Sequence, residues 1–172
     1  MFIGREKELA SLREFYEKDG IGMTVIYGRR RIGKSTLIAE FIRDKKAIFY
    51  TATKVGKNRN LELFSKQVID VLMPGVEDIS FKTTEAVFDF IDKNIGNDKI
   101  VIVIDELPYW AEKDNALLSV LQKYIDRVWN DKALKIIYAD PHLVLWRRRC
   151  LVSKALCLED VIPRLNWNRL II

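Results

Sequence analysis

The sequence predicts an α/β fold in which helices cover both faces of a parallel β-sheet. Segments with strand-like and helix-like hydrophobic spacing alternate along the chain, which is the pattern of strands joined by helical crossovers. Residues 100–104 form an unbroken β-branched run, as expected for a central strand buried on both faces. A glycine-containing loop at 28–35 joins a strand-like segment to a helix-like one. The 172 residues suffice for one core of ordinary domain size.

In the first third of the chain, helix-like and strand-like segments follow one another closely. Residues 5–17 carry apolar side chains at helical spacing and predict a helix. The short β-branched segment 23–27 predicts the first strand, and 35–44 returns to helical spacing. Residues 47–51 predict the second strand. The polar stretch 54–60 is expected to be an exposed loop.

The remaining elements repeat this alternation. Residues 61–73 have helical spacing until Pro74 stops it. Residues 83–95 predict a helix that begins at a capping threonine and is closed by a glycine. After the buried run at 100–104, an amphipathic helix is expected over 116–129 and a fourth strand over 134–138.

Residues 28–35 match the phosphate-binding pattern GxxxxGK[ST]. Gly28 and Gly33 allow the backbone to curl so that successive N–H groups point at phosphate oxygens. Lys34 can reach the β- and γ-phosphates, and the Ser35 hydroxyl can ligate Mg²⁺. The helix that follows places its N-terminus beneath the phosphates. The predicted nucleotide-binding residues of this loop are Gly28, Arg29, Arg30, Arg31, Ile32, Gly33, Lys34, Ser35 and Thr36.

The three arginines inside this loop have no single assignment from the sequence. Arg29, Arg30 and Arg31 could contact phosphates, an acid of a partner or a helix of the same domain. Solvated or packed loop charges are an equally good interpretation of each.

Two carboxylates follow the buried strand at 100–104. Ligands of an open α/β sheet bind at the carboxyl ends of its strands, so Asp105 and Glu106 should emerge beside the phosphate loop. Asp105 fits the acid that organises Mg²⁺ together with Ser35. Glu106 fits the catalytic base that orients and deprotonates an attacking water. The combination of this strand with the upstream loop is far more specific than either motif alone.

Composition and charge restrict the class of protein. The chain is 49% hydrophobic and 31% charged, it has no apolar stretch long enough to cross a bilayer, and its N-terminus becomes charged too early for a signal peptide. Both cysteines lie late in the chain without metal-ligand partners nearby. We therefore expect a cytoplasmic protein without a membrane segment.

The net charge of +5 lies mostly in the tail, since residues 1–137 hold 23 lysines and arginines against 21 acids. This distribution gives little support for nucleic-acid binding.

The chain resembles the archaeal-type P-loop ATPases of the STAND and AAA-related branch. The residues that carry this resemblance are the segments 2–9, 27–35, 104–109 and 121–126. It covers about residues 1–138 and implies a P-loop NTPase sheet of the ASCE type, here incomplete. It also implies that ATP and Mg²⁺ bind, that hydrolysis is slow or regulated, and that the ATP state acts as a switch toward an unidentified protein partner. By the same resemblance, Ile3, Gly4 and Arg5 are candidate nucleoside contacts.

Residues 139–172 depart from that family, so the chain is divided into an ATPase core at 1–138 and a divergent tail at 139–172. After the fourth strand the family has a Cys-Gly-Ser-Ser-like sensor segment and later a helical lid, whereas this chain continues Tyr138-Ala139-Asp140-Pro141-His142. Our hypothesis is a reading-frame shift near Tyr138, which would leave the tail poorly packed and hydrolysis impaired.

The leading interpretation is a regulatory domain that binds ATP with Mg²⁺ and hydrolyses it. One alternative is a non-hydrolysing, nucleotide-dependent interaction module. Another is a basic protein associated with nucleic acid through the arginine-rich loop and tail. A small-molecule kinase is less favoured because Asp105 and Glu106 form an ATPase-like pair and no acceptor site is evident.

The reading-frame hypothesis is tested by sequencing the gene. One permitted back-translation from Tyr138 begins TAT GCG GAT CCT CAT, and removal of its first two bases gives codons for Cys-Gly-Ser-Ser. Codons permitted for Ser153 to Asp160 likewise regroup to Gln-Ser-Pro-Leu-Phe-Gly-Arg-Arg, a second family motif. We expect one shifted frame to encode both motifs. A gene in which no shifted frame does so would rule the hypothesis out.

Overall fold

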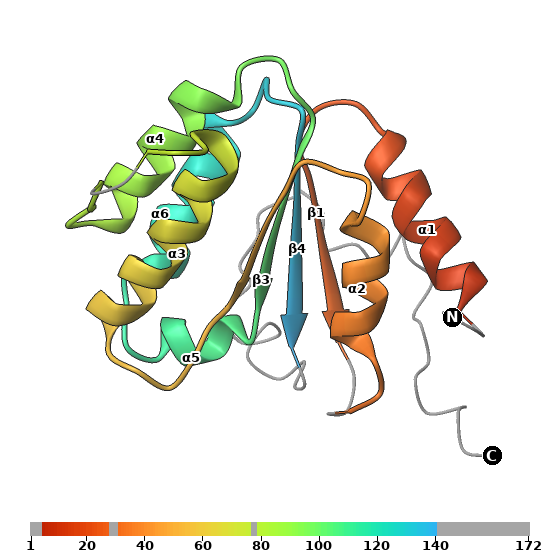
Figure 1. Cartoon of the computed structure of the whole chain (residues 1–172), viewed down its shortest axis with the longest axis horizontal. Coiled ribbons are helices and arrows are strands. Elements are labelled where there is room, and N and C mark those ends of the chain that lie inside the picture. The colour runs from red at the N-terminus through yellow and green to blue at the C-terminus, as the bar shows by residue number, and fades with distance from the viewer. Residues whose placement is uncertain (1–4, 28–30, 77–78, 141–172) are drawn as a thin grey trace.

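Four parallel strands form the centre of the computed structural model, which describes residues 5–27, 31–76 and 79–140. In spatial order the sheet is β1-β4-β3-β2, with every neighbouring pair parallel (Figure 1). The strands are β1 (Gly22–Tyr27), β2 (Ala47–Thr51), β3 (Ile100–Asp105) and β4 (Leu134–Asp140). The predicted α/β fold class is confirmed.

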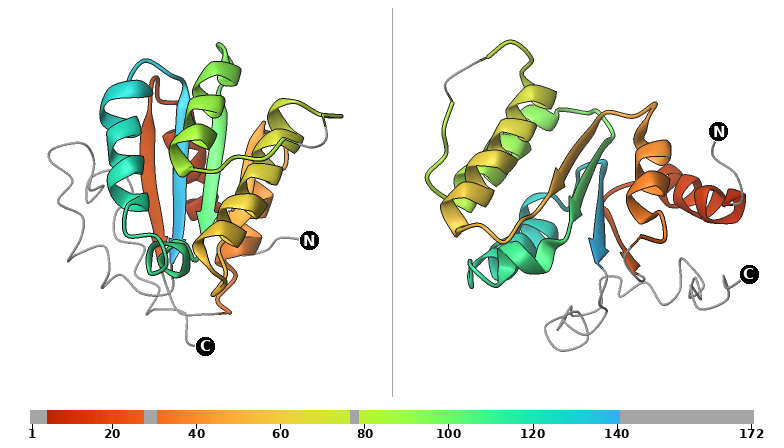
Figure 2. Two further views of the ribbon diagram at one scale, coloured as in Figure 1. Left: turned by 90° about the vertical axis from the view of Figure 1, so that its left-hand side faces the viewer. Right: turned by 60° about the horizontal axis from the view of Figure 1, so that its bottom comes forward.

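Helices cover both faces of this sheet (Figures 1 and 2). One face carries α1 (Glu6–Glu17) and α2 (Lys34–Ile42). The other carries α3 (Lys57–Leu72), α4 (Thr84–Ile95), α5 (Leu107–Ala111) and α6 (Leu117–Lys123), which a π-helical turn, η1 (Tyr124–Val128), extends. Across the described ranges, no helix has both the length and the apolar character needed to cross a membrane.

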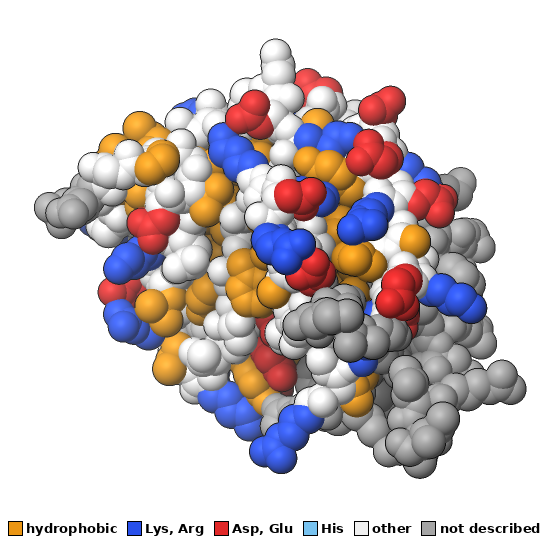
Figure 3. All heavy atoms as spheres, turned by 45° about the vertical axis from the view of Figure 1, so that its right-hand side comes forward, with side chains coloured by type: hydrophobic (Ala, Val, Ile, Leu, Met, Phe, Trp, Pro, Cys, Tyr) orange, Lys and Arg blue, Asp and Glu red, His pale blue; other side chains and the backbone are white. Residues whose placement is uncertain are grey.

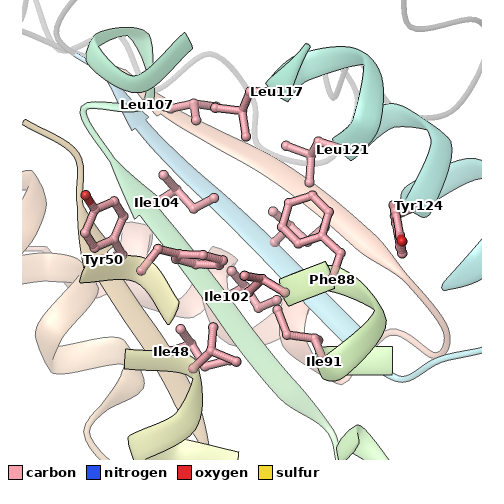
Figure 4. Close-up of a cluster of buried hydrophobic side chains, with 14 of the residues drawn as sticks. Ile48, Tyr50, Phe88, Ile91, Ile102, Ile104, Leu107, Leu117, Leu121 and Tyr124 are labelled. Atoms are coloured by element: carbon pink, nitrogen blue, oxygen red, sulfur yellow. The ribbon is translucent and has the colours of Figure 1, made fainter. Parts of the chain in front are cut away.

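The two-sided core follows from the alternation of side chains along β3. Val101 and Val103 pack toward α1 and α2, where they meet Leu12, Leu37 and Phe41. The intervening isoleucines pack toward the other layer, as Figure 4 shows for Ile102 and Ile104 beside Phe88, Leu117 and Leu121. Every residue of β3 is buried, as is typical of a central strand in a parallel sheet.

The predicted polar loop at 54–60 is wrong in its second half, because α3 already begins at Lys57. The reason is Asn60, whose amide is completely buried. Its Oδ1 accepts hydrogen bonds from Tyr50 Oη (2.6 Å) and from the Thr53 N–H (3.1 Å), and its Nδ2 donates to the carbonyls of Thr53 and Val55. Burial raises the pKa of Tyr50 to about 12, so the phenol remains a donor. A polar residue is thus buried because it holds the connection between β2 and α3.

The predicted helix over 116–129 is shorter and ends differently. After α6, the Trp129 N–H donates to the carbonyl of Tyr124, which is the wider spacing of a π-turn. The wider turn accompanies the packing of Tyr124 and Trp129 against each other and against Phe88, with ring centroids 5.2–5.3 Å apart. Residues 107–111, directly after the end of β3, form the short helix α5.

Strand β4 runs two residues beyond the predicted end at Tyr138. Ala139 and Asp140 continue the parallel register beside Ile26 and Tyr27 of β1. The first two residues of the predicted tail therefore belong to the sheet, and its remainder, 141–172, lies outside the described residues.

At the amino ends of the strands, two lysines hold the end of α1. Lys135 is 1% exposed and its Nζ donates to the Gly20 carbonyl (2.8 Å). Lys99 Nζ donates to the carbonyl of Tyr16 (3.1 Å). These contacts satisfy carbonyls at and just beyond the C-terminus of the helix. Desolvation by burial lowers the pKa of the Lys135 ammonium.

Gly22 should not tolerate a side chain at this crowded position. A Cβ there would lie 2.9 Å from Cε2 of buried Phe15 and 3.2 Å from Cδ of Lys135. We expect Gly22→Ala to lower the free energy of unfolding by about 1–3 kcal/mol, measured by urea denaturation. Gly56→Ala is the matched control, since nothing lies within 4 Å of its Cβ position, and should change stability by less than about 0.5 kcal/mol. Equal losses in both variants would contradict this assignment.

Candidate nucleotide-binding site

The candidate site lies at the edge of the sheet where the strands end, which is the lower edge in Figure 1. Tyr27 of β1 and Asp105 of β3 both pair with the end of β4, at Asp140 and Ala139 respectively. The helix α2 also starts at this edge, shortly after β1 ends. Parallel pairing therefore brings the residues after β1 and those after β3 together, as the sequence predicted.

The described part of the phosphate loop turns sharply through left-handed backbone at two positions. Arg31 (φ 65°) and Gly33 (φ 81°) both lie in the left-handed region. Gly33 directly precedes α2, and its carbonyl accepts the Leu37 N–H (3.0 Å). The N–H groups in the first turn of a helix point toward its N-terminal end, which makes that end of α2 suited to an anion. Gly28, Arg29 and Arg30 lie outside the described residues.

The side chains that follow this turn differ in exposure. Lys34, the first residue of α2, is only 8% exposed, whereas Arg31, Ser35 and Thr36 are exposed. Lys34 thus lies at the start of the helix that follows the loop, where a lysine of this motif reaches the phosphates. This placement suits a cation that meets phosphate groups.

The two sequence motifs meet in one hydrogen bond. Ser35 Oγ donates to Asp105 Oδ2 at 2.9 Å, although the two residues are 70 positions apart. Asp105 is 7% exposed, so its carboxylate is directed into the site and not into solvent. Hydroxyl and carboxylate oxygens are the ligands that Mg²⁺ accepts, usually together with water and substrate phosphate. The residues present therefore fit a magnesium ion bound through one or two protein oxygens.

Glu106 is held in an unusual backbone conformation. It has φ 55° and ψ 33°, in the left-handed region that few residues other than glycine adopt. Its N–H donates to the Ala139 carbonyl of β4 (2.9 Å), which fixes the end of β3 to its neighbour. The helix α5 begins at the next residue, so the chain turns sharply at the partly exposed glutamate. Such strain is typical of functional sites, where surrounding contacts maintain it.

Sequence reasoning missed the loop between β2 and α3 as a neighbour of the site. The Ala52 N–H donates to the Asp105 carbonyl (2.8 Å), so this loop leaves the sheet beside the two carboxylates. Lys54 Nζ lies 5.0 Å from the ring centroid of Tyr109 on α5, within cation–π range. The buried amide of Asn60, described above, fixes the same loop. A lone asparagine in a polar stretch gave no signal of this role.

The N-terminal candidates are only partly described. Ile3 and Gly4 lie outside the described residues. Arg5 immediately precedes α1, and its guanidinium donates to the Ile32 carbonyl in the phosphate loop. The structure therefore brings Arg5 to the site through the loop backbone, while its predicted contact with the nucleoside stays a prediction.

Solved structures resemble this fold at low sequence identity. A Walker-type ATPase of Pyrococcus abyssi superposes with a TM-score of 0.60 at 21% identity, covering 86% of this chain and 47% of that chain. Drosophila ORC bound to DNA superposes with a TM-score of 0.65 at 16% identity, covering 82% and 38% respectively. These similarities confirm the P-loop NTPase type of fold.

Curated relatives come from Methanocaldococcus jannaschii. One uncharacterised protein is 29% identical over 155 residues, which are 90% of this chain. The chain spans 33% of the length of that relative. An uncharacterised ATP-binding protein is 39% identical over 46 residues, which are 27% of this chain and 78% of that protein.

The sequence also matches a protein family as a whole. Residues 2–140 match the family described as an ATPase domain predominantly from Archaea. That range contains the phosphate loop, both carboxylates and all four strands. The chain belongs to this family of archaeal ATPase domains.

Proposed function

We propose that this chain binds ATP with Mg²⁺ and hydrolyses it slowly, as a regulatory switch domain of the STAND and AAA-related branch. The observation that carries the proposal is the 2.9 Å hydrogen bond between Ser35 and Asp105. This hydrogen bond joins the start of α2 to the end of β3. It therefore places the buried Lys34 and the adjacent Glu106 at one site. We place the protein in the cytoplasm on the sequence grounds given above.

In this proposal the binding residues act mainly through charge and orientation. Lys34 neutralises the β- and γ-phosphates, and the N–H groups at the start of α2 hold their oxygens. Ser35 and Asp105 would hold Mg²⁺, which when bound neutralises phosphate charge and orients the γ-phosphate. Arg31 is exposed within the loop and can add positive charge there. Arg29, Arg30 and Thr36 complete the proposed binding set, together with Ile32 and the two glycines, Gly28 and Gly33.

Glu106 is the proposed base. It follows Asp105 directly, and its turned backbone moves its side chain out of the alternation of β3 and toward the edge of the sheet. A carboxylate there can orient a water molecule toward the γ-phosphate and accept its proton. The peptide unit between Asp105 and Glu106 is fixed by two hydrogen bonds, because its carbonyl accepts from the Ala52 N–H and its N–H donates to the Ala139 carbonyl.

The competing proposal from another class is a module that binds nucleotide without hydrolysing it and presents the bound state to a protein partner. The divergence of the tail after β4 favours it, because the sensor segment expected by family resemblance is missing from the sequence. Hydrolysis in a single turnover separates the two proposals.

The described residues on the face drawn in Figure 3 give no support for nucleic-acid binding. Figure 3 shows lysines, arginines and acids interspersed on the described part of one face, with no continuous basic stripe. Several exposed cations are paired with acids, among them Arg43 with Glu40 (3.0 Å) and Arg59 with Glu62 (2.6 Å). We therefore do not propose this function.

Lys34→Ala should abolish tight nucleotide binding, because it removes the cation that meets the phosphates. We expect affinity for Mg·ATP to fall by at least about 100-fold, measured by isothermal titration calorimetry. Lys66→Ala is the matched control, since Lys66 is exposed on α3 and makes no predicted contact with the site; it should leave affinity unchanged. If the parent chain binds no nucleotide, the proposed function is wrong.

Glu106→Gln should remove hydrolysis and spare binding, because the amide cannot accept the proton from water. We expect the single-turnover rate to fall by about 100-fold or more while the affinity for Mg·ATP changes by less than about threefold. Glu112→Gln, an exposed change just past α5, should keep the parent rate. Binding without measurable turnover in the parent chain would instead support the interaction-module proposal.

A further inference from the structure

Arg5 makes a long-range contact with the phosphate loop that the function proposed above does not use. Its guanidinium donates to the carbonyl of Ile32, 27 residues later in the chain. The same guanidinium covers Gly33, since Nη2 and Cζ lie 3.7 and 3.8 Å from the position that a Cβ on Gly33 would occupy. Arg5 therefore packs on the peptide unit between Ile32 and Gly33.

The geometry of that peptide unit gives the contact a consequence for phosphate binding. In a trans peptide the carbonyl and the N–H point in opposite directions, and the unit rotates as a rigid plane. When Arg5 holds the Ile32 carbonyl on its side, the N–H of Gly33 must point to the opposite side of the loop. A loop that binds phosphates needs its N–H groups inward and its carbonyls outward.

Arg5 is itself held by a well-packed helix. Its own carbonyl accepts the Leu9 N–H (3.0 Å) and so starts α1. Leu12 and Phe15 anchor this helix in the core at 1% and 2% exposure. At the far end, Lys99 and Lys135 donate to carbonyls at and just beyond the C-terminus of the helix, as described above. The guanidinium thus reaches the loop from the start of a helix that the core fixes in place.

From these contacts we infer that Arg5 is a positioning residue for the phosphate loop: it orients the Ile32–Gly33 peptide so that the Gly33 N–H faces the bound phosphates. This role rests on the proposed nucleotide binding but differs from a nucleoside contact, which would act on the base or ribose. It predicts that Arg5 contributes to the affinity of any ligand that carries the phosphate chain, whether or not a nucleoside is attached.

The experiment compares two probes, Mg·ATP and Mg·tripolyphosphate, by calorimetry on the full chain. Arg5→Met removes the donor and should weaken both probes about tenfold or more, by the same factor. Arg5→Lys keeps a cationic donor and should restore both to within about threefold of the parent. Arg13→Met is the matched control, because Arg13 is exposed on the same helix and its loss changes net charge equally; it should alter neither affinity.

The outcomes separate this inference from the proposed function. If the parent chain binds neither probe, the proposed function fails. If the parent binds both and Arg5→Met weakens only Mg·ATP, Arg5 is a nucleoside contact and the inference is overturned. Equal losses in Arg5→Met and Arg13→Met would also overturn it, since they would reflect charge alone.

Thermal unfolding measured without ligand shows whether each variant folds. If Arg5→Met does not fold, Arg5→Gln, which keeps an uncharged donor, takes its place: an equal loss of about threefold for both probes supports the inference, and unchanged tripolyphosphate affinity overturns it.

Discussion

The complete burial of β3 determines where every other part of the site can lie. A strand covered on both faces must run through the middle of the sheet, and its carboxyl end must then open between neighbouring strands. Asp105 sits at that end, still mostly buried, and meets Ser35 from the start of α2. The paired helical layers are needed to bury the valines and isoleucines of this strand. The core and the candidate site therefore share one cause.

Polar groups buried near the site organise its surroundings in a way that apolar packing does not. The amide of Asn60 binds both backbone groups of Thr53 and the phenol of Tyr50 at once, which fixes the loop after β2 beside the carboxylates. Asp114 plays a similar part just after α5: it is 4% exposed, accepts from the Ala116 N–H (3.2 Å) and pairs with Lys57 of α3 (3.1 Å). Fully satisfied polar networks of this kind favour one arrangement over its alternatives.

The sequence predicted those features that depend on local pattern or on a motif of fixed spacing. All four strands, the helix after the loop and the meeting of Ser35 with Asp105 belong to this group, because hydrophobic period and parallel topology dictate them. The early start of α3 and the π-turn after α6 could not be predicted. Each depends on a tertiary contact, with Asn60 in one case and with a cluster of aromatic rings in the other. The contact of Arg5 likewise depends on how α1 packs.

The left-handed backbone at Glu106 also affects which substitutions are favourable at the position of the proposed base. Asparagine and glycine adopt that conformation more readily than glutamate, so either residue would relax the turn after β3. Each would at the same time remove the carboxylate proposed as the base. The substitutions that reduce backbone strain at Glu106 are therefore the same ones that would remove the proposed base. Under the proposed function, a variant that keeps the fold and the nucleotide site, and gains stability as it loses the proposed base, differs by one residue.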